Sequence, residues 1–167
     1  MEHRIRRVVT GHDANGSAIV QRDEELELQR VQVHEMKEAA EDPAFFGKLW
    51  TSAGSPADNN DPEDGAKRTT GLTLPGGSVV RIVDMPPHHR SPMHRTQSLD
   101  YGFVLVGQVV LELDAGRRVE MKAGDVAIQR GTIHAWLNET DDWARVAFVL
   151  LDAQPVVAGG RTIDPTH

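Results

Sequence analysis

The sequence predicts an all-β fold, a sandwich or barrel of short strands that follows a less regular N-terminal part. From Gly76 onward, short apolar runs recur about every 8–12 residues. Turn-forming residues such as Gly107, Gly131 and the Asp114-Ala115-Gly116 segment separate these runs. No helix-forming stretch lies between them, which argues against parallel βαβ units. The expected strands cover residues 79–83, 101–106, 109–113, 119–121, 126–129, 134–138 and 144–151.

The N-terminal part is polar and irregular to about Ala66. A turn sequence at residues 13–16, Asp-Ala-Asn-Gly, predicts a hairpin between the runs at residues 5–10 and 17–20. The apolar cluster at residues 45–52 is expected to form a strand or a sheet edge. The remaining segments are expected to be a loop or a helix start at 24–27, a helix at 35–41 that ends before Pro43, and a loop at 55–66. Residues 159–167 lack apolar periodicity and are expected to be loosely held.

Length and composition narrow the class of protein. The 167 residues correspond to one domain with room for a substantial core. The absence of cysteine excludes a disulfide scaffold, a zinc ribbon, an iron–sulfur protein and a thiol nucleophile. No apolar run is long enough to cross a membrane, and the arginine-rich first nine residues do not resemble a secretory signal. A cytoplasmic protein is therefore expected.

The charge balance limits the partners. Eighteen basic and 25 acidic side chains give a formal net charge of −7. Binding of nucleic acid or of an anionic membrane surface needs clustered positive charge, so neither partner is expected. With one tyrosine and three tryptophans, the chain also offers little for stacking nucleic-acid bases. A small molecule is the expected partner.

The segment from His94 to Asp100 is the first candidate for a functional site. In an extended chain, alternate side chains share a face, so His94, Thr96 and Asp100 are expected to line one wall. A carboxylate at the start of an apolar strand is costly unless it is paired, hydrogen-bonded or metal-bound. Spacing alone leaves open whether Asp100 has such a role, pairs with Arg130, or is half solvated.

Two motifs in this part of the chain resemble those of the cupin superfamily. Gly131, His134 and Asn138 fit the spacing of the second cupin motif, with Gln129 in the place of its usual proline. In the first motif, His94 matches the first histidine, and the required six residues separate Asp100 from Gly107. Thr96 stands in the place of the second histidine and Asp100 in that of the glutamate, while His88 occupies the position of the leading glycine. The resemblance covers about residues 76–152.

The resemblance implies a double-stranded β-helix, the jelly-roll barrel of cupins, over residues 71–155. Residues 1–70 are then an extension and residues 156–167 a tail. Carried over position by position, His94, Asp100 and His134 are the metal ligands and catalytic residues, a set that suits Fe, Mn, Zn or Ni. The resemblance also implies a homodimer, for which the apolar residues of the extension, Phe45, Phe46, Leu49 and Trp50, would be suited.

Four further residues are candidates for substrate contact. Thr96 lies on the same expected wall as His94, and Arg130 offers a guanidinium that can bind a carboxylate with two hydrogen bonds. Tyr101 is either an outward-facing wall residue or a phenol in the pocket. Trp136 either packs in the core or lines the pocket.

The resulting functional hypothesis is a cupin enzyme that binds a small polar or carboxylated metabolite inside its barrel at a divalent metal. Oxygenation, decarboxylation and a lyase or isomerase step are all compatible with it. A second hypothesis is a metal-independent dehydratase or epimerase, in which the same histidines and Asp100 act as acid and base. A third is a ligand-binding sensor module.

Overall fold

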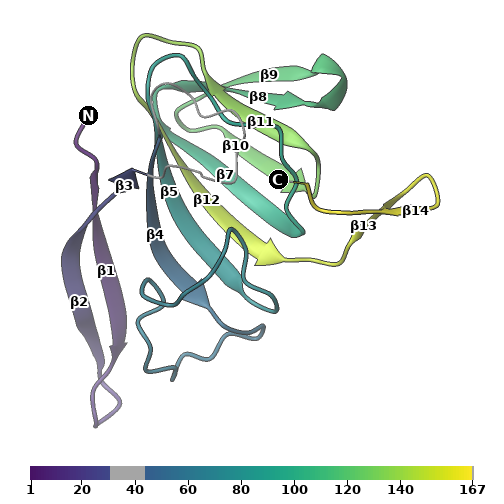
Figure 1. Ribbon diagram of the computed structural model, residues 1–167. Helices are drawn as coiled ribbons and strands as arrows, with labels where there is room; N and C mark the ends of the chain where they lie inside the picture. Colours follow the sequence, from purple (N-terminus) through teal and green to yellow (C-terminus); the bar gives the residue numbers. More distant parts are fainter. Residues whose placement is uncertain (31–43, 167) are drawn as a thin grey trace.

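The computed structural model describes residues 1–30 and 44–166, and its regular structure there is almost entirely β-strand. Two antiparallel sheets face each other and form the barrel (Figure 1). One has six strands in the order β10-β7-β12-β5-β4-β3, and the other has four in the order β6-β11-β8-β9. The larger sheet consists of β3 (Gln29–Arg30), β4 (Phe45–Ser52), β5 (Ser78–Met85), β7 (Ser98–Val106), β10 (Val126–Arg130) and β12 (Ala144–Asp152). The smaller consists of β6 (His89–Arg90), β8 (Gln108–Leu113), β9 (Arg118–Lys122) and β11 (His134–Asn138).

The core fills the space between the two sheets. Val104 and Val146 of the larger sheet pack with Val109, Met121 and Trp136 of the smaller one in a single buried cluster. Each of these strands alternates inward-facing and outward-facing side chains, as the pleat of a strand requires. The jelly-roll barrel expected from the sequence is therefore present, with its apolar core enclosed by both sheets.

A glycine makes room for the largest core side chain. Gly102 lies on the inner face of β7, and a Cβ at this position would come within 3.3 Å of the Trp136 ring and 3.2 Å of the Phe148 ring. The two rings meet edge to face, with 5.3 Å between their centroids. The indole of Trp136 thus reaches from the smaller sheet to the backbone of the larger one.

The N-terminal hairpin stands beside β4 (Figure 1). It consists of β1 (Arg4–His12) and β2 (Ala18–Glu27), and its turn lies where the sequence predicts it. Residues 24–27, expected to be a loop or a helix start, instead belong to β2. Their carboxylates lie opposite arginines of β1, as in the pair between Arg4 and Glu25 at 3.1 Å. Cross-strand pairs of opposite charge favour the strand here, although acidic residues are otherwise uncommon in strands.

The first 70 residues are not a separate layer. β4, which is expected from the sequence to belong to the extension, pairs with β5 over most of its length and lies in the larger sheet. Phe46 packs on the core, and Phe45 stacks on His3 with 3.8 Å between ring centroids. These two rings are therefore used within the chain. The helix expected at residues 35–41 lies outside the described residues.

The C-terminal residues are partly ordered by a second small hairpin. It consists of β13 (Val156–Ala158) and β14 (Arg161–Ile163), and an isolated bridge joins Thr166 to Arg95. The loosely held tail expected from residue 159 onward is thus replaced in part by strand pairing. No helix in the described part of the chain is long and apolar enough to span a membrane.

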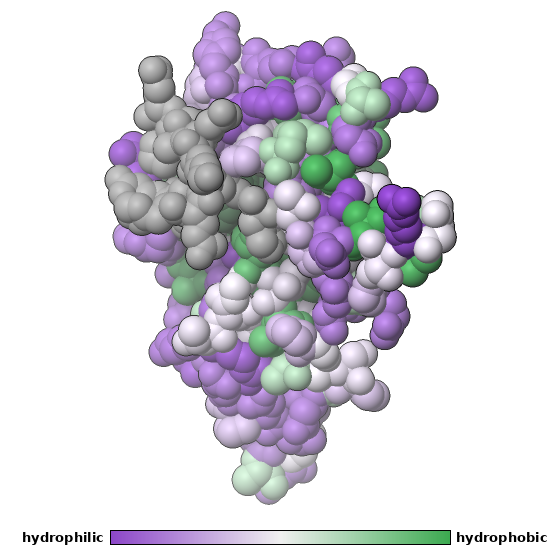
Figure 2. All heavy atoms as spheres, turned by 45° about the vertical axis from the view of Figure 1, so that its right-hand side comes forward, coloured by the Kyte–Doolittle hydropathy of each residue, from purple (hydrophilic) through white to green (hydrophobic). Residues whose placement is uncertain are grey.

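The surface is mainly hydrophilic. On the face drawn in Figure 2, hydrophobic side chains form separate small patches among hydrophilic ones. Elsewhere, the outward-facing side of β7 and β10 exposes Phe103, Leu105, Val126 and Ile128.

Candidate functional site

His94 and His134 are brought together by the backbone. The two residues form an isolated antiparallel bridge in which each N–H donates to the carbonyl of the other at 2.9 Å. This bridge links the segment before β7 to the start of β11. The two imidazole rings lie on the same side of it, with 4.3 Å between their centroids. Two histidines that are 40 positions apart in the sequence thus form one pair.

Backbone carbonyls orient both rings. Nδ1 of His94 lies 3.0 Å from the carbonyl of Pro92, and Nδ1 of His134 lies 2.9 Å from the carbonyl of Thr132. A carbonyl only accepts hydrogen bonds, so each Nδ1 carries the proton. In the neutral ring, Nε2 is then left with a free lone pair. Each imidazole is therefore held as a base.

Asp100 lies on the inner face of β7 and ends a short chain of hydroxyl groups. The Ser98 hydroxyl donates to the Thr96 hydroxyl at 2.7 Å, and Thr96 Oγ1 lies 3.4 Å from Asp100 Oδ2. All three side chains are buried. Thr96 is therefore placed beside Asp100, where it can help to hold the carboxyl group in one orientation.

Burial changes the acid–base properties of both kinds of group. Burial raises the pKa of Asp100, and the neighbouring hydroxyls and His94 offset part of this effect. Burial and repulsion from His94 lower the pKa of His134 to about 4. The structure thus favours an uncharged His134 and a carboxyl that retains its proton more readily than an ordinary aspartate does. An uncharged imidazole can accept a proton, and a carboxyl of raised pKa can donate one, so the two groups can take opposite roles in proton transfer.

Several buried polar atoms around this site have no hydrogen-bond partner within the described residues. They are Oδ1 of Asp100, both amide atoms of Gln129, and Nε1 of Trp136. Gln129 lies directly opposite Asp100 in the pairing of β10 with β7. Unsatisfied buried polar atoms are costly and uncommon in folded proteins. Their presence on the inner faces indicates positions that a bound ligand or water would satisfy.

The pleat of the strands determines which of the residues expected to contact substrate face the inside of the barrel. Trp136 lies inside the barrel. Arg130 and Tyr101 lie next in sequence to the inward-facing Gln129 and Asp100, so they project from the outer face. The structure does not bring either of them to the site. Arg130 is exposed and does not pair with Asp100, and Tyr101 is half-buried among outward-facing neighbours.

Two inward-facing residues were not assigned a role from the sequence. In the sequence, Gln129 stands out only because it occupies the position of the motif's proline, and Arg81 lies within an expected strand. Arg81 pairs in register with Phe148, whose ring packs on the barrel core. The sequence feature that could have indicated a role for Arg81 is its position as the single charged residue between valines and an isoleucine in an otherwise apolar run.

The described residues do not supply a three-ligand metal site. Among them, no three His, Asp or Glu side chains are placed so that they could hold one metal ion. Asp is one methylene shorter than the glutamate of the cupin motif, and Thr96 does not replace the missing second imidazole. The pair of histidines is positioned as two ligands would be, but Asp100 does not complete the set.

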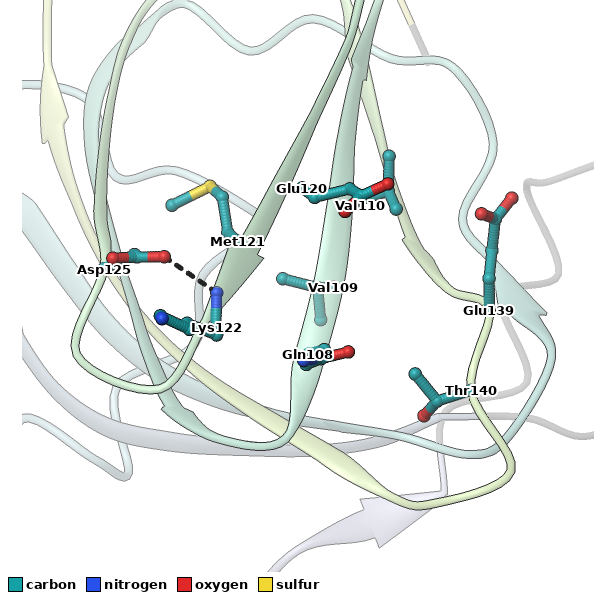
Figure 3. Close-up of a pocket in the computed structure, with 9 residues that line it drawn as sticks. All are labelled: Gln108, Val109, Val110, Glu120, Met121, Lys122, Asp125, Glu139 and Thr140. Atoms are coloured by element: carbon teal, nitrogen blue, oxygen red, sulfur yellow. Dashed lines mark hydrogen bonds between the residues drawn. The ribbon is translucent and has the colours of Figure 1, made fainter.

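A hollow lies elsewhere on the molecule. It has a volume of about 360 Å³ and lies between β8, β9, the turn before β10 and the loop after β11 (Figure 3). It is lined by Glu120, Lys122 and Glu139 among others, and the Lys122 backbone N–H donates to Asp125 at 2.9 Å. Neither imidazole of the pair nor Asp100 lines it. The hollow and the histidine pair are therefore separate features of the structure.

Comparison with known proteins gives consistent matches. Residues 81–150 match the family model of the cupin domain. The cupin-domain-containing oxidoreductase fogC of Aspergillus ruber is 32% identical, and the match covers 96% of this chain and 79% of that protein. Phomopsin biosynthesis cluster protein C′ of Diaporthe leptostromiformis is 51% identical over 94 residues, which are 56% of this chain and 50% of that protein.

The fold also matches a solved structure. A cupin-2 domain from Rhodospirillum rubrum superposes with a TM-score of 0.51 at 12% identity, covering 84% of this chain and 73% of that one. The chain matches about half the length of phomopsin biosynthesis cluster protein C′, and about half the length of protein D from the same organism.

Proposed function

The chain belongs to the cupin-domain proteins, and on that premise we propose that it is an enzyme that transfers protons on a small polar metabolite inside its barrel. The His94–His134 pair is the base and Asp100 is the acid. The observation that carries this proposal is a pair of adjacent imidazole rings, each held at Nδ1 by a carbonyl, in the same barrel as a buried carboxyl of raised pKa.

The chemistry that fits these groups starts at a carbon next to a carbonyl. The imidazole pair removes a proton from this carbon, and the C–H electron pair becomes the C=C bond of an enol. The proton of Asp100 is shared with or passed to the carbonyl oxygen, so that charge does not accumulate there. Delivery of a proton from water to the other face, with the abstracted proton released to solvent and the oxygen-bound proton returned to Asp100, gives epimerisation. Departure of a β-hydroxyl as water, with the proton that the imidazole pair has taken and with return of the other proton to Asp100, gives dehydration. Neither outcome needs an oxidant.

Proton exchange with solvent tests this proposal without knowledge of the natural substrate. The protein is incubated in D₂O with 3-hydroxybutyrate, 2-oxobutyrate and acetoacetate, and the loss of C–H signal is followed by NMR. Exchange is expected with the wild-type protein and is expected to fall by about 100-fold or more in His134→Gln. His12→Gln, at an exposed histidine of the hairpin, is the matched control and should behave as the wild type. Equal exchange in all three proteins, or none in the wild type, would refute the proposal.

A metal-dependent oxidative reaction is the second candidate. Histidines that bind a metal usually donate their other ring N–H to a carbonyl or carboxylate, and both members of this pair do so. A relative named as an oxidoreductase adds support. Elemental analysis of protein purified without chelator or polyhistidine tag, beside His94→Ala, distinguishes the two. A stoichiometric transition metal that the variant loses would favour the oxidative reaction over metal-free proton transfer.

The homodimer expected from the sequence remains a proposal. The outer face of β7 and β10, with its exposed Phe103, Leu105, Val126 and Ile128, supports it. Sedimentation equilibrium tests it, and a single species of 18.4 kDa at high concentration would refute it.

A further inference from the structure

We propose that Arg81, with Lys48 beside it, forms an anion subsite on the inner face of the barrel that binds the carboxylate of the substrate. This inference deepens the proposed function and depends on it for the position of the reacting carbon. It replaces Arg130, the arginine suggested by the sequence for this task, with one on the opposite face of the sheet.

The strand pairing places both cations on the inner face. Arg81 of β5 lies opposite Lys48 of β4 and opposite Phe148 of β12. Residues directly opposite each other in paired strands point to the same face. Phe148 packs against Trp136 in the core, and Phe46, two positions from Lys48, packs there as well. Arg81 and Lys48 therefore start from the same wall as the core residues.

No carboxylate of residues 1–30 or 44–166 contacts either cation of this pair. Nη2 of Arg81 donates to the backbone carbonyls of Gly71 and Leu72, and Nε is buried without a partner among the described residues. Lys48 Nζ donates to the carbonyl of Arg68. Within the described part of the chain, neither side chain forms a salt bridge, although Glu63 offsets part of the burial effect on Lys48.

Two other half-buried or buried arginines of this chain are neutralised by carboxylates, whereas the half-buried Arg95 donates to backbone carbonyls as Arg81 does. Arg7 is held by Asp64 and Glu24, and Arg145 by Asp84. The contrast matters because burying a cation without a counter-charge is costly. Burial lowers the pKa of Arg81 with no carboxylate acting against it, and both burial and Arg81 itself lower the pKa of Lys48. Two adjacent cations that no carboxylate of the described residues contacts are a suitable site for an anionic group.

The strand register gives the separation between Arg81 and Asp100. Arg81, Phe148 and Gly102 are in register on three neighbouring strands, and Asp100 lies two residues further along β7. With strands about 4.8 Å apart and a rise of about 3.3 Å per residue, the Cα atoms of Arg81 and Asp100 are roughly 12 Å apart. The two side chains span part of this distance. A small carboxylic acid can therefore contact the guanidinium at one end and Asp100 at the other.

The carbonyls that hold Arg81 also fix its direction. Gly71 and Leu72 belong to the segment that leads into β5, and the N–H of Gly76 in this segment donates to Asp152 at 2.8 Å. Asp152 pairs with Ser98, the first residue of β7. The segment that holds the guanidinium therefore enters the sheet at the end where Ser98 lies, with Asp100 two residues further along β7.

Matched acids and amides test the subsite directly. Benzoate, 4-hydroxybenzoate and 3-hydroxybutyrate are titrated into the full chain by calorimetry, each beside its uncharged primary amide. The wild type is expected to bind acids more tightly than their amides. Arg81→Gln should weaken acid binding by about ten-fold or more and leave amide binding within about two-fold, because only the charge-assisted hydrogen bonds are lost. Arg130→Gln removes the same charge from the outer face and should leave both unchanged.

Other outcomes would overturn the inference. One is that the wild type binds acids and amides equally tightly. The other is that Arg81→Gln and Arg130→Gln weaken acid binding to the same extent. If Arg81→Gln does not fold, as judged by circular dichroism, Lys48→Gln takes its place, with an expected loss of about three-fold for acids alone. His134→Gln separates the two proposals, because it should lose solvent exchange but retain the preference for acids. If the wild type binds acids more tightly than amides but does not catalyse exchange of C–H protons with solvent, only the proposed reaction is refuted.

Discussion

Replacement of His134 by glutamine should remove a specific acid-dependent loss of stability. His134 is 3% exposed, and its pKa is lowered from 6.5 to about 4 by burial and by His94. The folded state therefore binds fewer protons than the unfolded state between these two values. Stability attributable to this group is full above pH 6.5 and falls as the pH decreases toward 4.

The size of the effect follows from the two pKa values. Because the folded state disfavours the protonated imidazole, the free energy of unfolding is expected to be lower by about 2 kcal/mol at pH 5 and about 3 kcal/mol at pH 4 than at neutral pH. Glutamine does not titrate, so His134→Gln should lack this component whatever its stability at pH 7. The comparison thus concerns the slope with pH and not the absolute stability.

Urea unfolding at pH 7.5, 6, 5 and 4 measures this slope. The free energy of unfolding of the wild type should fall more steeply than that of His134→Gln, by about 2 kcal/mol between pH 7.5 and 5. The exposed His12 provides the control His12→Gln, which should follow the wild type. Parallel curves for the wild type and His134→Gln would contradict the burial of an uncharged imidazole at this position.

Four other substitutions test the site and its support. Asp100→Asn should stabilise the protein at pH 8 in thermal unfolding, because the raised pKa of Asp100 means that its contribution to stability is present at low pH and lost as pH rises; a lower melting temperature would contradict this. Arg145→Gln should cost about 3–5 kcal/mol in urea unfolding, since it leaves the fully buried Asp84 without its bidentate partner. Arg6→Gln, at an exposed ion pair, should cost at most about 1 kcal/mol, and equal losses would refute this reasoning. Gly102→Ala should cost about 1–3 kcal/mol by crowding two aromatic rings, and an unchanged midpoint would show that the rings can move.

Much of the barrel could be predicted from local pattern. The expected strands at residues 45–52 and 134–138 have the observed bounds, because apolar runs between turn-forming residues fix the length of a strand. The meeting of His94 and His134 followed from resemblance to a family motif, since the bridge between them joins distant segments. Residues 24–27 could not be assigned locally, because the arginines that stabilise them as a strand are on the opposite side of the hairpin.

The site was harder to predict because each residue's face depends on strand parity. A shift of one position decides that Gln129 faces the interior and Arg130 faces solvent. The same parity turns Arg81 inward, within a run that reads as apolar core. Motif spacing identified the acid and base candidates, but it could not show which arginine accompanies them.

The most direct test of the proton-transfer account is the rate of solvent exchange in protein treated with EDTA, compared among the wild type, His134→Gln and Asp100→Asn. The account predicts that the wild type retains exchange after chelation and that each variant loses about 100-fold or more. Exchange that disappears on chelation and returns with added metal, or that persists unchanged in either variant, would contradict it.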